Sequence, residues 1–146
     1  MFVEHLLSKA RGRLVTIADD APLIQAAKLL RTGTDLVIVC DSAGLLTGVI
    51  TKSDIVEQIS RCRGESCTMA AALVMTRDVV FCRSNDSLHD VWERMKKRSL
   101  KNIPVVDQDF RPLGLLHARD ILQVFLNDSE YEESILRDYV MGVGYR

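Results

Sequence analysis

Aromatic residues and long apolar runs are both scarce in this sequence, which has 1 Trp, 3 Tyr and 4 Phe in 146 residues. The longest uncharged apolar run, Met69 to Met75, is far shorter than the roughly 20 residues of a membrane-spanning helix. Residues 1–13 include Glu4 and lack the apolar core of a secretion signal. Neither sign of charge dominates, because a net charge of −1 gives no general attraction to nucleic acid or anionic membranes. We therefore expect a cytoplasmic protein that binds neither.

Cysteine is also sparse, and the four cysteines do not form a metal-binding pattern. Cys40 and Cys82 fall in strand-like runs, whereas Cys62 and Cys67 are separated by four residues with no histidine nearby. That spacing is poor for zinc, so reduced thiols and no metal are expected. No Ser/His/Asp or Cys/His arrangement indicates catalysis, and the sequence does not predict an enzyme.

The sequence contains one pattern twice. Gly48-Val-Ile-Thr-Lys-Ser-Asp54 recurs as Gly114-Leu-Leu-His-Ala-Arg-Asp120 at an offset of 66 residues. Apolar residues at helical spacing recur at an offset of 65, as Leu23, Ala26, Ala27 and Leu30, then as Leu88, Val91, Trp92 and Met95. Two repeats of about 65 residues indicate a pseudo-symmetric pair in which each repeat buries a face on the other. We expect an N-terminal helix and first repeat in 1–66, a second repeat in 67–128, and an acidic helix with a tail in 129–146.

Each repeat is predicted to fold as β-α-β-β-α, an α/β (α+β) layer with helices on one face of a small sheet. The expected strands are 14–17, 36–40, 45–51, 79–82, 102–106 and 113–117. The expected helices are 1–13, 53–60, a short one at 69–75, 88–98, 119–126 and 129–140. One more helix is expected to be capped by Asp19 or Asp20, to have Pro22 in its first turn, and to end at Gly33.

The joint between strand and helix in each repeat is the predicted chemical site. The glycine permits close approach of a ligand, free N–H groups at a helix start favour anions, and Thr51 or Ser53 can add hydroxyl donors. Asp54 can accept two hydrogen bonds from a ribose diol, as a carboxylate does in dinucleotide sites. In the alternative reading, Thr51 only caps the helix and Asp54 lies in its first turn.

At these motifs the chain resembles paired CBS domains, the cystathionine β-synthase type of regulatory module also called the Bateman module, and most closely the stand-alone bacterial type with two repeats. The resemblance covers Leu14 to Leu126 and rests on "VTIADDAPLIQAAKLL", "GVITKSDIV", "VMTRDVV", "NIPVVD" and "GLLHARDIL". It implies binding of AMP, ADP, ATP or S-adenosylmethionine, with NADH also a candidate, in two clefts between the repeats, and no required metal.

The resemblance also assigns nucleotide-binding residues. Ribose is expected at Asp54 and Asp120, and phosphates are expected at Thr51, Lys52, Ser53, His117 and Arg119. Adenine is expected against Thr16, Ile17 and Ala18 or Phe81, Cys82 and Arg83, and against backbone from Val37 to Val39 or at Ile103, Pro104 and Val105. His117 stands where the family prefers Thr or Ser, so it is either a phosphate ligand that strengthens on protonation or an imidazole at a helix start.

These observations predict a non-catalytic sensor of adenine nucleotides. The alternative is a ligand-independent interaction module that regulates a partner enzyme, with a redox enzyme as one candidate. A homodimer is expected, because Ile55, Val56 and Ile59 recur as Ile121, Leu122 and Phe125. The basic residues Arg94, Lys96, Lys97, Arg98 and Lys101 either meet a polyanion or form a solvated helix face.

Overall fold

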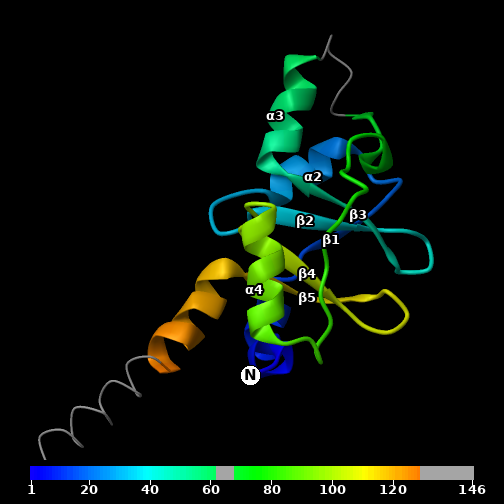
Figure 1. The fold of residues 1–146 in the computed structure, drawn as a ribbon. Helices are drawn as coiled ribbons and strands as arrows, with labels where there is room; N and C mark the ends of the chain where they lie inside the picture. Colours follow the sequence, from blue (N-terminus) through cyan, green and yellow to red (C-terminus); the bar gives the residue numbers. More distant parts are fainter. Residues whose placement is uncertain (62–67, 129–146) are drawn as a thin grey trace, which may run out of the picture.

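The first repeat forms a three-stranded sheet with two helices (Figure 1). The computed structural model describes residues 1–61 and 68–128, and the predicted helix 129–140 lies outside them. The elements of the first repeat are β1 (Thr16–Ala18), α2 (Leu23–Leu29), β2 (Leu36–Cys40), β3 (Leu46–Thr51) and α3 (Lys52–Ser60). β1 pairs parallel with β2, and β2 pairs antiparallel with β3.

The second repeat reproduces this order with a smaller sheet. α4 (Leu88–Lys97) is followed by β4 (Asn102–Val106), β5 (Pro112–His117) and a helix at 118–128. Val37 lies opposite Ile50 in the first hairpin and Ile103 lies opposite Leu116 in the second, so the two registers match at the offset of 66. The prediction of tandem α/β repeats is confirmed.

The predicted strand 79–82 is wrong, because only Cys82 pairs, through one parallel bridge to Val105. In the first sheet the N–H of Ile38 donates to the carbonyl of Val15, at 2.9 Å. Pro104 occupies the position equivalent to Ile38 and has no N–H, so the corresponding bond cannot form. The single bridge remains because the N–H of Cys82 still donates to the carbonyl of Pro104, at 3.0 Å.

Each repeat is completed by a segment from the other half of the sequence. η1 (Val3–Leu6) and α1 (Leu7–Gly12) pack on the second repeat, and η3 (Ala71–Leu73) packs on the first. The N–H of Leu88 donates to the carbonyl of Met1 at 3.0 Å, and that of Leu23 donates to the carbonyl of Met69 at 2.7 Å. The segments that begin at Met1 and Met69 are therefore structurally equivalent.

Glycines allow both segments to approach the sheets. A Cβ built on Gly114 would lie 2.6 Å from the backbone carbon of Ala10, and one on Gly48 would lie 2.6 Å from the sulfur of Met75. The backbone of α1 thus lies directly against β5, at a distance that only glycine permits.

Three helix predictions need correction. Residues 69–75 form only the single 3-10 turn η3, because the N–H groups of Ala71 and Ala72 donate to the first repeat rather than within a helix. α2 has Pro22 as its N-cap instead of Asp19 or Asp20 and ends at Leu29, before Gly33. The N-terminal helix begins as a 3-10 helix with three residues per turn, so Val3 and Leu6 face inward and Phe2 is exposed.

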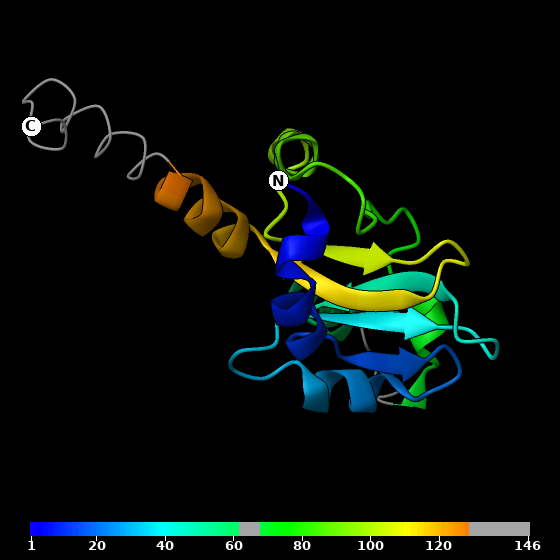
Figure 2. The same cartoon turned by 90° about the horizontal axis from the view of Figure 1, so that it is seen from below.

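Three apolar clusters hold the molecule together. One lies in each repeat, and the central cluster joins the two sheets through Leu36, Ile38, Leu46, Val49, Val106 and Leu115. Figure 2 shows the strands of both sheets one above another, with the N-terminal helices beside them. In the described ranges, no helix has the length and apolar character needed to cross a membrane.

Candidate functional site

A cavity of about 310 Å³ lies at the junction of the two repeats, and we call it the first cavity. Six apolar residues line it, namely Leu36, Val49, Val79, Val80, Leu100 and Pro104. Six polar residues line it as well, namely Thr51, Asp54, Thr76, Asp78, Arg98 and Asn102. The apolar side chains can pack against a flat ring, and the polar ones can orient a hydroxylated group.

Thr51 and Asp54 bring the predicted strand-to-helix joint into this cavity. The N–H of Thr51 donates to Oδ2 of Asp54 at 2.8 Å, and the N–H of Asp54 donates to Oγ1 of Thr51 at 3.3 Å. This reciprocal arrangement caps α3, as in the alternative reading of the motif. Oδ1 of Asp54 accepts only a longer bond, from Oγ1 of Thr76 at 3.4 Å. One carboxylate oxygen of Asp54 thus caps the helix, and the other faces Thr76.

The rim of the first cavity carries an ion pair. A guanidinium nitrogen of Arg98 lies 2.7 Å from Oδ2 of Asp78, and both side chains are largely exposed. The hydrogen bond from Arg98, with the attraction of its charge, lowers the pKa of Asp78. Both signs of charge therefore stand at the opening.

The equivalent site in the second repeat is nearly filled. It has a volume of about 10 Å³, and we call it the second cavity. Its lining includes Arg13, Asp35, Leu115 and His117. Beside it, Nε of Arg13 donates to Oδ2 of Asp120 at 3.0 Å, and a terminal nitrogen of Arg13 donates to Oδ1 at 3.2 Å. Both oxygens of Asp120 are engaged, and its side chain is only 8% exposed.

The imidazole of His117 makes a local hydrogen bond at the start of the 118–128 helix. Its Nδ1 accepts the N–H of Arg119 at 2.9 Å, which requires an unprotonated Nδ1. Burial lowers the pKa of His117, and the charges of Arg119 and Arg13 lower it further. Both effects favour the neutral ring, which is the protonation state that can accept this hydrogen bond.

The structure brings only some of the predicted nucleotide-binding side chains to a cavity. Thr51, Asp54 and Pro104 line the first cavity, and His117 lines the second. Arg83 lines a separate cavity of about 500 Å³, together with Ser84, Asn85, Val106, Asp107, Gln108, Asp109 and Leu113. Buried side chains, which belong to the apolar clusters, are those of Ile17, Val37, Val39, Cys82, Ile103 and Val105. Exposed residues are Thr16, Ala18, Lys52, Ser53 and Arg119.

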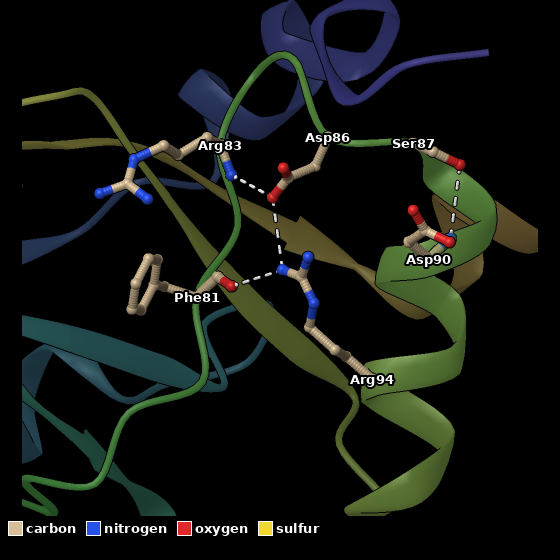
Figure 3. Close-up of polar contacts among 6 residues, drawn as sticks. All are labelled: Phe81, Arg83, Asp86, Ser87, Asp90 and Arg94. Atoms are coloured by element: carbon tan, nitrogen blue, oxygen red, sulfur yellow. Dashed lines mark hydrogen bonds and ion pairs between the residues drawn. The ribbon is translucent and has the colours of Figure 1, made fainter.

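Phe81 and Arg83 belong to a separate network (Figure 3). Arg94 donates to the carbonyl of Phe81 at 2.9 Å and to Asp86 at 3.3 Å, while Asp86 accepts the N–H of Arg83 at 2.9 Å. Arg83 also lies 5.2 Å from the ring centre of Phe81. The network holds the chain that leads into α4.

The basic residues around α4 take part in several ion pairs. Arg94 pairs with Asp86, Lys96 with Glu93 at 3.0 Å, and Arg98 with Asp78. These ion pairs offset part of the positive charge that a polyanion would bind, as is typical of a solvated helix face.

Sequence reasoning missed several residues of the two cavities. Thr76, Val79 and Val80 lie in the first cavity, and all three precede the predicted contact at Phe81 in the sequence. Arg13 is equivalent to Asp78 at the offset of 65, so the repeat could have pointed to both positions. Within 1–61 and 68–128, no group of three or more His, Cys, Asp or Glu side chains is placed to hold a metal ion.

Comparison with known proteins gives a consistent family. The family model described as "CBS domain" matches residues 3–61 and 70–127 of this chain. The chain is 27% identical to a homoserine O-acetyltransferase of Methanosphaera stadtmanae over 84% of this chain and 26% of that protein. For the first three curated relatives it spans 26%, 23% and 28% of their lengths, so it matches about a quarter of each.

Solved structures agree with the fold. The CBS-domain containing protein ATU1752 from Agrobacterium tumefaciens is 27% identical with a TM-score of 0.71, over 84% of this chain and 91% of that one. The CBS domain pair of protein MJ0100, solved with 5′-methylthioadenosine and S-adenosyl-L-methionine, is 26% identical with a TM-score of 0.72, over 88% and 98%. With both repeats matched in sequence and in structure, this chain belongs to the CBS-domain family as a tandem CBS pair.

Proposed function

We propose that this CBS pair is a non-catalytic regulatory module that binds an adenosine-containing ligand in the first cavity. The observation that carries the proposal is that Thr51 and Asp54 share the lining of that cavity with six apolar residues. Its volume of about 310 Å³ is at the lower end of the range for small-molecule sites. The ligands found with the MJ0100 pair, 5′-methylthioadenosine and S-adenosyl-L-methionine, support the adenosine class.

The residues that line the first cavity match the chemistry of a nucleoside. A purine can pack against apolar lining residues such as Val80 and Pro104. Oδ1 of Asp54 is placed to accept hydrogen bonds from a ribose diol, and such bonds to a charged acceptor are strong. AMP, ADP, ATP, S-adenosylmethionine and NADH share this nucleoside part, which is why the proposal names the class.

Regulation follows from where the cavity lies. Its walls come from both repeats, so a ligand contacts two bodies whose packing can change. A ligand that prefers one arrangement shifts the population toward it. The matched relatives include enzymes whose length greatly exceeds the shared part, which supports an enzyme as the regulated partner.

We also propose a homodimer that uses the helices after the two motifs. Val56 and Ile59 on α3 are 65% and 61% exposed, and Leu122 and Leu126 on the 118–128 helix are 41% and 55% exposed. Val56 and Leu122 are equivalent at the offset of 66, and exposed apolar side chains on both helices fit a two-fold interface, to which each subunit contributes the same surface. The predicted interface residues Ile55 and Ile121 are instead buried in the clusters of their own repeats, and Phe125 packs edge-on against Trp92.

A thermal-shift screen tests the nucleotide proposal. AMP, ADP, ATP, S-adenosylmethionine, 5′-methylthioadenosine and NADH are added to the full chain, and a ligand at 100 times its Kd stabilises the fold by about 2.7 kcal/mol. Asp54→Asn should abolish the shift. Asp90→Asn is the matched control, because Asp90 holds the same position after the N-cap Ser87 of α4 and does not line the first cavity.

The outcomes separate two functions. A shift that Asp54→Asn removes and Asp90→Asn retains supports nucleotide sensing. No shift with any of the six compounds at millimolar concentration refutes it. The second candidate, a ligand-independent interaction module, then stands on the exposed apolar residues of α3 and the 118–128 helix.

A further inference from the structure

The two equivalent sites of this chain differ in one ion pair. At the first cavity, Asp78 pairs with Arg98 at the exposed rim, and about 310 Å³ remains open. At the second, the position equivalent to Asp78 is Arg13, which reaches across to the motif aspartate Asp120. Only about 10 Å³ remains there, close to the space of one water molecule.

We propose that Arg13 is an internal occupant of the second site, so that each chain binds one adenosine ligand, in the first cavity. The inference rests on the proposed function and extends it to stoichiometry. Two nitrogens of the guanidinium face the two oxygens of Asp120, at 3.0 and 3.2 Å. A planar fork that engages both oxygens is the strong form of this interaction. A ribose diol needs those same oxygens.

The position of Arg13 is fixed by the fold. Arg13 directly follows α1, whose Ala10 is fully buried and lies against the backbone of Gly114. Val3 and Leu6 anchor the preceding turn in the core of the second repeat. The backbone at Arg13 is therefore held next to the second cavity, and the fork needs only a side-chain rotamer.

Asp120 also lacks the local partner that Asp54 has. Asp54 exchanges hydrogen bonds with Thr51, whereas His117 stands at the equivalent position and accepts the N–H of Arg119. Since Asp120 is buried, its charge requires a partner, and Arg13 supplies it. The His117 and Arg13 substitutions thus act together to close one site of the pair.

Titration calorimetry on the full chain tests the inference, with 5′-methylthioadenosine and AMP as probes. Wild type should bind one ligand per chain, and Arg13→Gln should bind two, because the glutamine cannot form the fork. Arg11→Gln is the matched control, since it removes the same charge from an exposed position of α1 and should keep one site. The single variant Asp54→Asn should bind no ligand, and the double variant Arg13→Gln/Asp54→Asn should bind one ligand per chain.

Each result decides a specific point. Two ligands per wild-type chain overturn the role of Arg13 and leave the nucleotide proposal intact. One bound ligand that survives Asp54→Asn overturns both the role of Arg13 and the assignment of the ligand to the first cavity. One ligand per folded Arg13→Gln chain, with folding verified by circular dichroism, also overturns it. If Arg13→Gln does not fold, the wild-type stoichiometry and the Asp54→Asn result still decide. No binding by any variant refutes the proposed function and this inference with it.

Discussion

Gly114→Ala tests the close contact between the N-terminal helix and the second repeat. The new Cβ would meet three atoms of Ala10: the backbone carbon at 2.6 Å, and its Cβ and oxygen at 2.8 Å. Two of these are backbone atoms, so they cannot move aside as a flexible side chain can. Overpacking of a core costs about 1–3 kcal/mol, and we expect the upper part of that range. The melting temperature should fall by roughly 5–10 °C.

Two other glycines provide the comparison in the same circular-dichroism melts. Gly48→Ala should cost less, because the nearest atoms belong to the flexible side chain of Met75, although the carbonyl oxygen of Thr76 also lies at 2.8 Å. Gly12→Ala meets nothing within 4 Å and should be neutral or stabilise the helix by up to about 1 kcal/mol. If Gly114→Ala has the same melting temperature as wild type, α1 does not lie against β5 as described.

Three further results are expected. Ile59→Glu with Leu122→Glu should halve the mass found by light scattering without unfolding the chain, and a wild-type mass of 16.4 kDa would refute the dimer. The folded pKa of His117 lies below its ordinary 6.5, so the neutral ring stabilises the fold above that pH and the contribution is lost as the pH falls through the folded pKa. Urea unfolding at about pH 7.5 and about pH 5 should thus show a larger loss for wild type than for His117→Asn, and equal losses would contradict this. Burial raises the pKa of Cys82 to about 12, so iodoacetamide should label it only in unfolded protein, and labelling of the native chain would show that Cys82 is accessible.

The sequence was sufficient for the elements whose pattern is local. The hairpin strands at 36–40 and 102–106 and the helices that begin near residues 52 and 88 lie where alternation, spacing and caps predicted them. The repeat offset also predicted correctly that the two halves share one architecture.

Prediction failed where the deciding partner is distant in sequence. The start of α2 is set by the carbonyl of Met69, which accepts the N–H of Leu23 in place of an aspartate cap. The strand expected at 79–82 is limited by Pro104, more than twenty residues later. Neither partner can be identified from a local pattern.

The residues of the candidate site follow the same rule, because those in a local turn were predicted and those with distant partners were missed. The motif identified Thr51 and Asp54 because both belong to one local turn. Val79 and Val80 were missed because they enter the first cavity from the start of the other repeat. Arg13 was missed because its partner Asp120 is 107 residues away.

Each repeat is completed by a segment from the other half of the sequence, so the two repeats do not become complete at the same time during synthesis. The first repeat is contiguous in the chain, since every buried member of its cluster falls between Ile17 and Met75. The second is assembled from Val3, Leu6 and Ala10 together with residues from Cys82 onward, so the first repeat is an insertion within it. We expect the first repeat to fold while the ribosome is still making the second. Once folded, it brings its two ends together at the central cluster through Leu14 and Val79, which shortens the effective loop that the second repeat must close.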